Sequence, residues 1–169
     1  MVPRNRLLSM LALSLILVAG DGRCSDEMTN LLKIGTVQIK AKVGKANIEV
    51  TIGTKRSTPV HLDVEAAANA TLDELKCNPT DVCLAVERFS ISVNGKRIAV
   101  PLSVYSDFTN LGLGRIAAHK EGYELLLIAG DGVTSREIRI VFSDDRVIRR
   151  SVYSDMAEDG KPVQETNYR

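Results

Sequence analysis

The strongest constraint on the fold is an alternation of apolar and polar residues along short segments of the chain. Every second residue is apolar between 47 and 52 and again between 89 and 93. Successive side chains of a strand point to opposite faces of a sheet, so this spacing predicts strands with one buried face. Asn94-Gly95 follows the second segment and predicts a two-residue hairpin turn, because both residue types accept positive φ angles. The chain is therefore expected to be built from hairpins.

Similar segments recur along the chain at intervals typical of a mainly β protein. We predict strands over residues 34–41, 47–52, 60–64, 83–93, 96–100, 115–119, 123–129, 135–142, 146–153 and 162–168. The apolar segment 123–129 is expected at the centre of a sheet, and the polar segment 162–168 at an edge, where proline is tolerated. One short helix is predicted within 65–76. The fold class is thus mainly β: an antiparallel sandwich or barrel of short strands with one short helix.

Three other segments are predicted as connections. Residues 53–59 are polar and are expected to form a loop, and residues 110–114 form a glycine-rich link. Residues 101–105 are expected to form a turn or a single helical turn with Pro101 at its first position. No low-complexity tract divides the chain, which predicts a single folded domain.

Residues 1–22 have the three parts of a secretory signal peptide. Two arginines make the start basic, residues 7–20 form an apolar run, and small residues close it. A membrane-spanning helix needs about 20 apolar residues, and this run is shorter. We therefore predict cleavage after Gly20 or Gly22, a single β-rich domain over residues 23–169, no membrane span in the mature chain, and a soluble protein that is periplasmic or secreted.

Removal of this segment changes the charge of the chain. The formal net charge is +1 for the full sequence; loss of Arg4 and Arg6 brings it to −1, and a cut that also removes Asp21 brings it to 0. Proteins that bind nucleic acid usually have a strongly basic domain or face. The near-neutral mature chain therefore predicts no nucleic-acid partner.

The sequence holds three cysteines, and export would place them in an oxidising compartment. Cys77 and Cys83 flank Asn78-Pro79, a pair typical of tight turns, so we predict a disulfide between Cys77 and Cys83. Three states of Cys24 stay open: a free thiol, a bond between two chains, or a bond that displaces one member of the predicted pair. Arg23 directly before Cys24 does not fit a lipidation signal.

A search for catalytic or metal-binding patterns yields little. His61 and His119 are the only histidines, and both are expected to be surface residues within strands. The nucleophile motif Gly-x-Ser-x-Gly and the phosphate-binding loop are both missing from the sequence. Two cysteines alone do not complete a zinc site. The sequence therefore predicts no metal and no cofactor.

One short motif occurs twice: the five residues 103–107 and the five residues 151–155 both read Ser-Val-Tyr-Ser-Asp. Each copy follows a basic and apolar segment. One interpretation is that both are similar strand exits in which tyrosine covers the edge of the core. The other is a pair of corners that form one interaction surface from Tyr105, Asp107, Tyr153 and Asp155.

Two longer stretches carry a resemblance. SISVNGKRIAVPLSVYSD and the meander YELLLIAGDG to EIRIVFSDDRVIRR lie in the second half of the chain. Together with the leader, they look like small exported bacterial β-rich proteins whose function is uncharacterised. This resemblance is one of pattern, and it implies neither an activity nor particular site residues.

The function expected from these features is a non-catalytic binding or interaction module outside the cytoplasm. Its partner would be another envelope protein or a cell-wall component, recognised by loops on a β scaffold. Two alternatives stay open. One is a structural component of the envelope. The other is a carboxylate-dependent hydrolase, since paired carboxylates suffice for glycoside chemistry; the candidate carboxylates are Asp107, Asp131, Asp144, Asp145 and Asp155.

Overall fold

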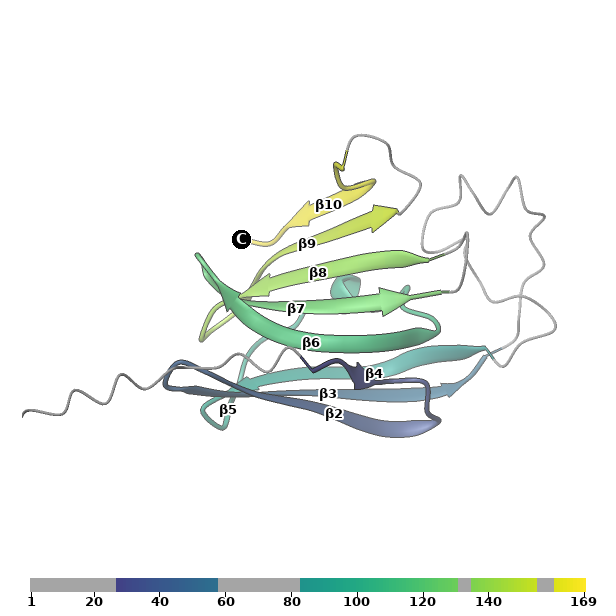
Figure 1. The fold of residues 1–169 in the computed structure, drawn as a ribbon, viewed down its shortest axis with the longest axis horizontal. Coiled ribbons are helices and arrows are strands. Elements are labelled where there is room, and N and C mark those ends of the chain that lie inside the picture. The colour runs from purple at the N-terminus through teal and green to yellow at the C-terminus, as the bar shows by residue number, and fades with distance from the viewer. Residues whose placement is uncertain (1–26, 58–82, 131–134, 155–159) are drawn as a thin grey trace, which may run out of the picture.

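The computed structural model describes residues 27–57, 83–130, 135–154 and 160–169, which form two antiparallel sheets (Figure 1). The predicted β class is confirmed as a sandwich-like arrangement, and neither sheet closes into a barrel among the described strands. The elements, in chain order, are β1 Thr29–Asn30, β2 Gly35–Val43, β3 Ala46–Arg56, β4 Leu84–Val93, β5 Lys96–Arg97, the 3₁₀ turn η1 Leu102–Val104, β6 Leu111–His119, β7 Gly122–Ala129, β8 Arg136–Phe142, β9 Val147–Ser154 and β10 Gln164–Asn167.

The first sheet has four strands in the order β2-β3-β4-β5. The Asn94-Gly95 hairpin is confirmed: the two residues have φ angles of 52° and 79°, and Val93 pairs with Lys96 across the turn. Ile48, Val50 and Ile52 are buried as predicted, because every second residue of β3 faces the other sheet.

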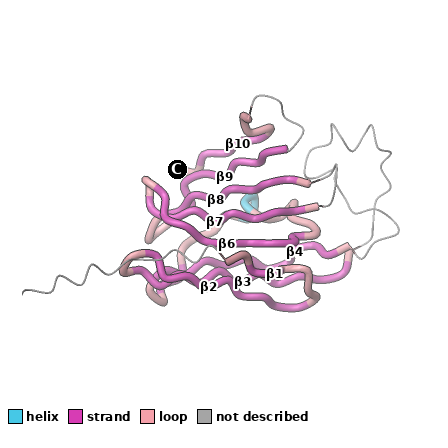
Figure 2. The backbone as a smooth tube through the Cα atoms, viewed as in Figure 1, coloured by secondary structure: helices cyan, strands magenta, loops and turns pink. Residues whose placement is uncertain are grey.

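The second sheet has six strands in the order β1-β6-β7-β8-β9-β10, as Figure 2 also shows. Strands β6 to β10 form a meander in which each strand pairs with the next. The predicted central position of β7 and the edge position of β10 are both confirmed. At the other edge, Asn30 of β1 pairs with Leu113 of β6, which joins the start of the described chain to its middle.

The apolar faces of the two sheets form one core. Its largest fully buried side chains come from both sheets and from the connection between them: Phe108, Phe142, Leu31, Ile52, Ile91, Ile116, Leu125, Leu127, Ile138, Ile140, Val50 and Val104. The sheets approach closely at Gly114, where a Cβ atom would lie 2.7 Å from Cδ1 of Ile39. A side chain at this position would meet the ends of the Ile39, Leu127 and Leu31 side chains at 2.7–3.0 Å, so these side chains would have to shift.

The connection from β5 to β6 crosses from one sheet to the other and covers part of the core. It contains η1, which lies behind the six-stranded sheet in the view of Figure 1. The predicted single helical turn is present, but Pro101 lies at the N-cap that precedes it and not at its first position. Asp107 fastens the connection through an ion pair with Arg150 of β9, at 2.5 Å between Oδ2 and Nη2. Both side chains are almost fully buried.

Three predicted boundaries are wrong. β3 continues to Arg56, into the predicted loop, because Thr54 to Arg56 pair with Leu84 to Val86 beyond a bulge. β6 begins at Leu111, where a glycine-rich link was predicted, and β5 contains only Lys96 and Arg97. The predicted strand 60–64, the predicted helix and the predicted signal segment all lie outside the described residues. Within the described part of the chain, no helix has the length and apolar character needed to cross a membrane.

Candidate functional site

The outer face of the four-stranded sheet is polar and carries an excess of positive charge. Alternation along β2, β3 and β4 turns one set of side chains away from the core, and Arg97 of β5 extends this set. We call this set the basic face; it consists of Thr36, Gln38, Lys40, Lys42, Asn47, Glu49, Thr51, Gly53, Arg88, Ser90, Ser92 and Arg97. A polar outer face is common in antiparallel sheets. Within this set Glu49 is the one carboxylate beside four cationic side chains, and Glu87, the neighbour of Arg88 on β4, lies 3.7 Å from Arg88.

Two hollows on the molecule are lined by residues of this face. The larger one has a volume of 490 Å³ and is lined by Thr36, Thr51, Gly53, Arg88, Phe89, Ser90, Arg97, Ile98, Val100 and Tyr105. The smaller one, of 360 Å³, is lined by Lys40, Ala41, Lys42, Asn47, Ile48, Glu49, Ser92 and Gly95. The larger hollow has cations, hydroxyls and aromatic rings in its lining and no carboxylate.

Arg88 and Arg97 border the larger hollow from two different strands. The Arg88 side chain is 76% exposed, and its ion pair with Glu87 is long, at 3.7 Å. Arg97 forms no ion pair with any described residue. Because Arg97 faces Ser92, four residues along β4 from Arg88, the two backbone positions lie about 14 Å apart at the rise of an antiparallel strand. Both long side chains can therefore reach a ligand between them.

Gly53 deepens the face at this point. It pairs with Thr36 on one side and with Arg88 on the other. A Cβ atom on Gly53 would lie 3.2 Å from Cβ and 3.3 Å from Nε of Arg88. The Arg88 side chain thus runs along the space that a larger residue would fill, and the glycine leaves room beside the guanidinium.

Glu49 separates the larger hollow from the smaller one and is already occupied. Its carboxylate accepts a hydrogen bond from Nε2 of Gln38 at 2.9 Å and pairs with Nζ of Lys40 at 3.2 Å. The Thr51 hydroxyl approaches the same carboxylate at 3.5 Å. These contacts neutralise the carboxylate of Glu49, so that Glu87, 3.7 Å from Arg88, is the carboxylate that competes for Arg88, while Arg97 forms no ion pair with any described residue.

Aromatic side chains form one end of the larger hollow. The ring of Tyr105 stacks on the ring of Phe89, with centroids 5.5 Å apart and planes inclined by 19°. Phe89 is anchored in the core against Phe108, while Tyr105 is half-buried. The Tyr105 hydroxyl makes no hydrogen bond with any described residue, so it can serve a ligand as donor or acceptor.

The outer face of the six-stranded sheet also carries charges, but these pair with one another. Arg139 contacts Glu137 at 2.5 Å and lies 4.8 Å from the ring centre of Tyr153. Partial burial works to lower the pKa of Arg139, but the hydrogen bond and charge of Glu137 outweigh it, so this pKa is raised. Arg139 is therefore held in place as a cation by its own neighbours.

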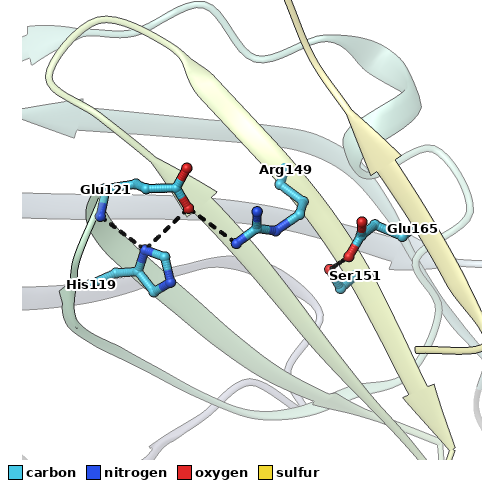
Figure 3. Close-up of polar contacts among 5 residues, drawn as sticks. All are labelled: His119, Glu121, Arg149, Ser151 and Glu165. Atoms are coloured by element: carbon cyan, nitrogen blue, oxygen red, sulfur yellow. Dashed lines mark hydrogen bonds and ion pairs between the residues drawn. The ribbon is translucent and has the colours of Figure 1, made fainter. Parts of the chain in front are cut away.

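A second group on this face shows the same internal pairing (Figure 3). Glu121 contacts Nη2 of Arg149 at 3.2 Å and Nδ1 of His119 at 3.9 Å. The Ser151 hydroxyl donates to Glu165 of the edge strand at 3.1 Å. Exposed pairs of this kind contribute about 1 kcal/mol or less each, and they leave little unpaired charge for a ligand. The two outer faces of the sandwich thus differ in their free charge.

The two tyrosines of the repeated Ser-Val-Tyr-Ser-Asp motif have different surroundings in the structure. Tyr105 packs against the core between the sheets, and Asp107 is buried in its ion pair with Arg150. Tyr153 lies on the outer face of the six-stranded sheet beside Arg139. Asp155 lies outside the described residues. Of the four residues of the predicted interaction surface, only Tyr105 borders the larger hollow.

The described carboxylates that were considered for a hydrolase each contact another side chain of the protein. Asp107 is buried against Arg150, and Asp144 accepts a hydrogen bond from the Tyr123 hydroxyl at 3.0 Å in the β8–β9 turn. Asp145 accepts a hydrogen bond from Ser143, which lowers the pKa of that carboxyl. Asp131 and Asp155 lie outside the described residues. Within the described ranges, no group of three or more His, Cys, Asp or Glu side chains could hold a metal ion.

Cys83 is buried, with 3% of its surface exposed. Cys24 and Cys77 both lie outside the described residues, so the pairing of Cys77 with Cys83 stays a prediction. His61 lies outside these residues too. His119 lies at the end of β6, where its ring accepts a hydrogen bond from the backbone N–H of Glu121 at 3.2 Å.

Reasoning from sequence alone missed the basic face. Its signal was present in the alternating segments, because Lys40 and Arg88 occupy outward positions of predicted strands. What the pattern could not supply is the order of the strands, which brings Arg88 and Arg97 to the same hollow.

Comparison with other proteins adds no relative: no protein-family model matches the chain, and no curated protein or solved structure is significantly similar to it.

Proposed function

We propose that this chain is a non-catalytic binding module that recognises an anionic partner through the basic face. The observation that carries the proposal is the 490 Å³ hollow, whose lining includes Arg88 and Arg97 but no carboxylate. The wider proposal is that the protein is exported, is periplasmic or secreted, forms the Cys77–Cys83 disulfide, and meets its partner on another envelope protein or in the cell wall.

Electrostatics supports the choice of partner. Cations that lack a paired carboxylate attract an anion during approach and form charge-assisted hydrogen bonds after contact. Arginine is well suited to this role because its planar guanidinium binds a carboxylate or phosphate through two parallel bonds. On the six-stranded sheet, Arg139 and Arg149 are paired with Glu137 and Glu121, and Arg150 is paired with Asp107.

Retention of the purified chain on an immobilised sulfated polysaccharide tests this proposal. The variant Arg88→Gln/Arg97→Gln should elute at lower salt than the unmodified chain, because two contacts to the polyanion are lost. The matched control is Lys120→Gln/Arg169→Gln, which removes the same charge from a turn and from the C-terminus, away from the basic face. Equal shifts for both variants would mean that only net charge matters, and the binding face would be rejected.

A third variant tests the sign of the effect. Glu49→Gln removes the one carboxylate of the face and releases Lys40 from its ion pair at 3.2 Å. Retention should therefore increase. Unchanged or weaker retention would contradict a binding surface centred on this sheet.

A further inference from the structure

The larger hollow combines three kinds of surface. Arg88 and Arg97 form a cationic rim, hydroxyl-bearing side chains lie along the sheet, and Tyr105 forms an aromatic end. We propose that this hollow binds a carboxylated sugar ring, either alone or as one unit of an acidic polysaccharide. This inference rests on the proposed function and names the ligand class of the same site.

The volume of the hollow suits one ring with its substituents. Small-molecule sites usually measure about 300–1,000 Å³, and this hollow measures 490 Å³. The smaller hollow of 360 Å³ lies further along the same face, beside Lys40 and Lys42. Lys42 offers a further cation at the smaller hollow, whose lining also includes Glu49 in its ion pair with Lys40.

The carboxylate would bind at Arg97. This side chain has no ion pair with any described residue, and it lies at the border of the hollow. A bidentate arginine–carboxylate contact is among the strongest surface hydrogen-bond arrangements. Arg88 supplies a second donor, because its exposed contact with Glu87 at 3.7 Å is weak and exchanges easily.

The sugar hydroxyls would meet Thr36, Thr51 and Ser90. The hydroxyls of Thr36 and Ser90 make no hydrogen bond with any described residue, and Thr51 makes only the 3.5 Å contact with Glu49. Each of these groups can both donate and accept, as sugar hydroxyls do.

The ring of the sugar would lie against Tyr105. One face of this aromatic ring is fixed by stacking on Phe89, so the ring is held in position before a ligand arrives. Ile98 and Val100 extend the apolar end of the hollow. The carbon-bound hydrogens of a sugar can cover this end, while the free Tyr105 hydroxyl reaches an oxygen of the ligand.

Calorimetric titration of the purified chain tests the assignment with four probes: glucuronic acid, glucose, glucose 6-phosphate and a short polyglutamate. Glucuronic acid should bind, and glucose should bind about tenfold more weakly or worse, because it lacks the charged contact. An oligomer of glucuronic acid distinguishes the two sources of the ligand. If the oligomer binds more tightly than glucuronic acid itself, the ligand is a polysaccharide chain. If the two bind equally well, the ligand is a single sugar.

Three variants locate the binding. Arg97→Gln should weaken glucuronic acid by about tenfold or more, and Thr51→Val and Tyr105→Phe should each weaken it by a smaller factor. Tyr153→Phe on the opposite sheet is the matched control for Tyr105→Phe and should leave binding unchanged. Equal effects of these two tyrosine variants would overturn the assignment of the hollow.

The remaining outcomes separate this inference from the proposed function. Tighter binding of glucose 6-phosphate or of polyglutamate, still sensitive to Arg97→Gln, would keep the basic face as an anion-binding surface and reject the carboxylated sugar. Failure of all the acidic probes, together with no retention on the sulfated polysaccharide, would reject both.

Discussion

The buried ion pair between Asp107 and Arg150 offers a sharp test of how the two sheets are joined. Asp107 belongs to the connection between β5 and β6, and Arg150 belongs to β9. Their side chains are 9% and 4% exposed, and Oδ2 contacts Nη2 at 2.5 Å. The Asp107→Ala substitution removes the carboxylate and leaves a cation buried without its partner.

The expected loss of stability follows from the surroundings of Arg150. Breaking a buried ion pair by removing one partner costs about 3–5 kcal/mol. Arg150 keeps two weaker contacts, the ring of Phe108 at 5.3 Å and the carbonyl oxygen of Ser103 at 3.5 Å. We therefore expect a loss near the lower end, about 3 kcal/mol. The pair is not perfectly satisfied even in the intact protein, since Oδ1 of Asp107 and Nε of Arg150 are buried without a hydrogen-bond partner among the described residues.

Urea unfolding of the single and double variants measures this effect. With a slope of about 2 kcal/mol per molar urea, a 3 kcal/mol loss lowers the midpoint by about 1.5 M. Arg150→Met should cost a similar amount, because Asp107 is then buried alone. Asp107→Ala/Arg150→Met should recover to within about 1 kcal/mol of the intact protein, since no unpaired charge is left inside.

Two results would refute this account. A loss below about 1 kcal/mol for Asp107→Ala would mean that the ion pair is exchangeable with water. A double variant as unstable as the sum of the two single variants would mean that the side chains act independently, despite their contact.

Three further predictions concern other parts of the chain. Gly122→Ala should lower the free energy of unfolding by at least about 2 kcal/mol, because its Cβ would lie 2.5 Å from the carbonyl oxygen of Phe142 in the neighbouring strand. The control Gly44→Ala, which has nothing within 4 Å of its Cβ, should lower it by about 1 kcal/mol. Equal urea midpoints for the two variants would contradict the clash. Because the pKa of Asp145 is lowered in the folded protein, this residue adds stability above its unfolded pKa, and that stability is lost as the pH falls through its folded pKa. Asp145→Asn should therefore flatten the acid limb of a plot of stability against pH. Superimposable profiles of the variant and the unmodified protein would count against this role. Peptide mass mapping of the oxidised protein should recover Cys77 linked to Cys83, and a peptide joining either residue to another cysteine would disprove the pairing.

Those parts of the fold that depend on neighbouring residues could be predicted from the sequence. The hairpin at Asn94-Gly95 formed as expected because the turn chemistry and the flanking alternation are both local. Ile138 and Ile140 are fully buried for the same reason. In contrast, Val141 occupies an outward position of the same strand, yet it is only 3% exposed, which alternation alone does not predict.

Other features depend on contacts between distant segments and were beyond reach. Gly112 and Gly114 resemble a flexible link in the sequence, but both lie in β6, where Gly114 packs closely against side chains of β2 and β7. The extension of β3 to Arg56 depends on pairing with Leu84, which local polarity does not reveal. The basic face has the same character, because Arg97 and Thr36 meet only once β5 and β2 take their places on either side of β3 and β4.

The pairing of β1 with β6 has a consequence for how the molecule assembles. Strands β6 to β10 can pair one after another, and each pairing closes a short loop at small entropic cost. Asn30 can meet Leu113 only after all strands of the four-stranded sheet, which lie between them in the sequence, have been synthesised. Contacts between residues so distant in sequence slow folding. During synthesis, Leu31 stays without the strand that later buries it to 1% exposure until β6 has emerged. A chain interrupted before β6 would present this leucine, and the apolar side of the first sheet, to chaperones and proteases.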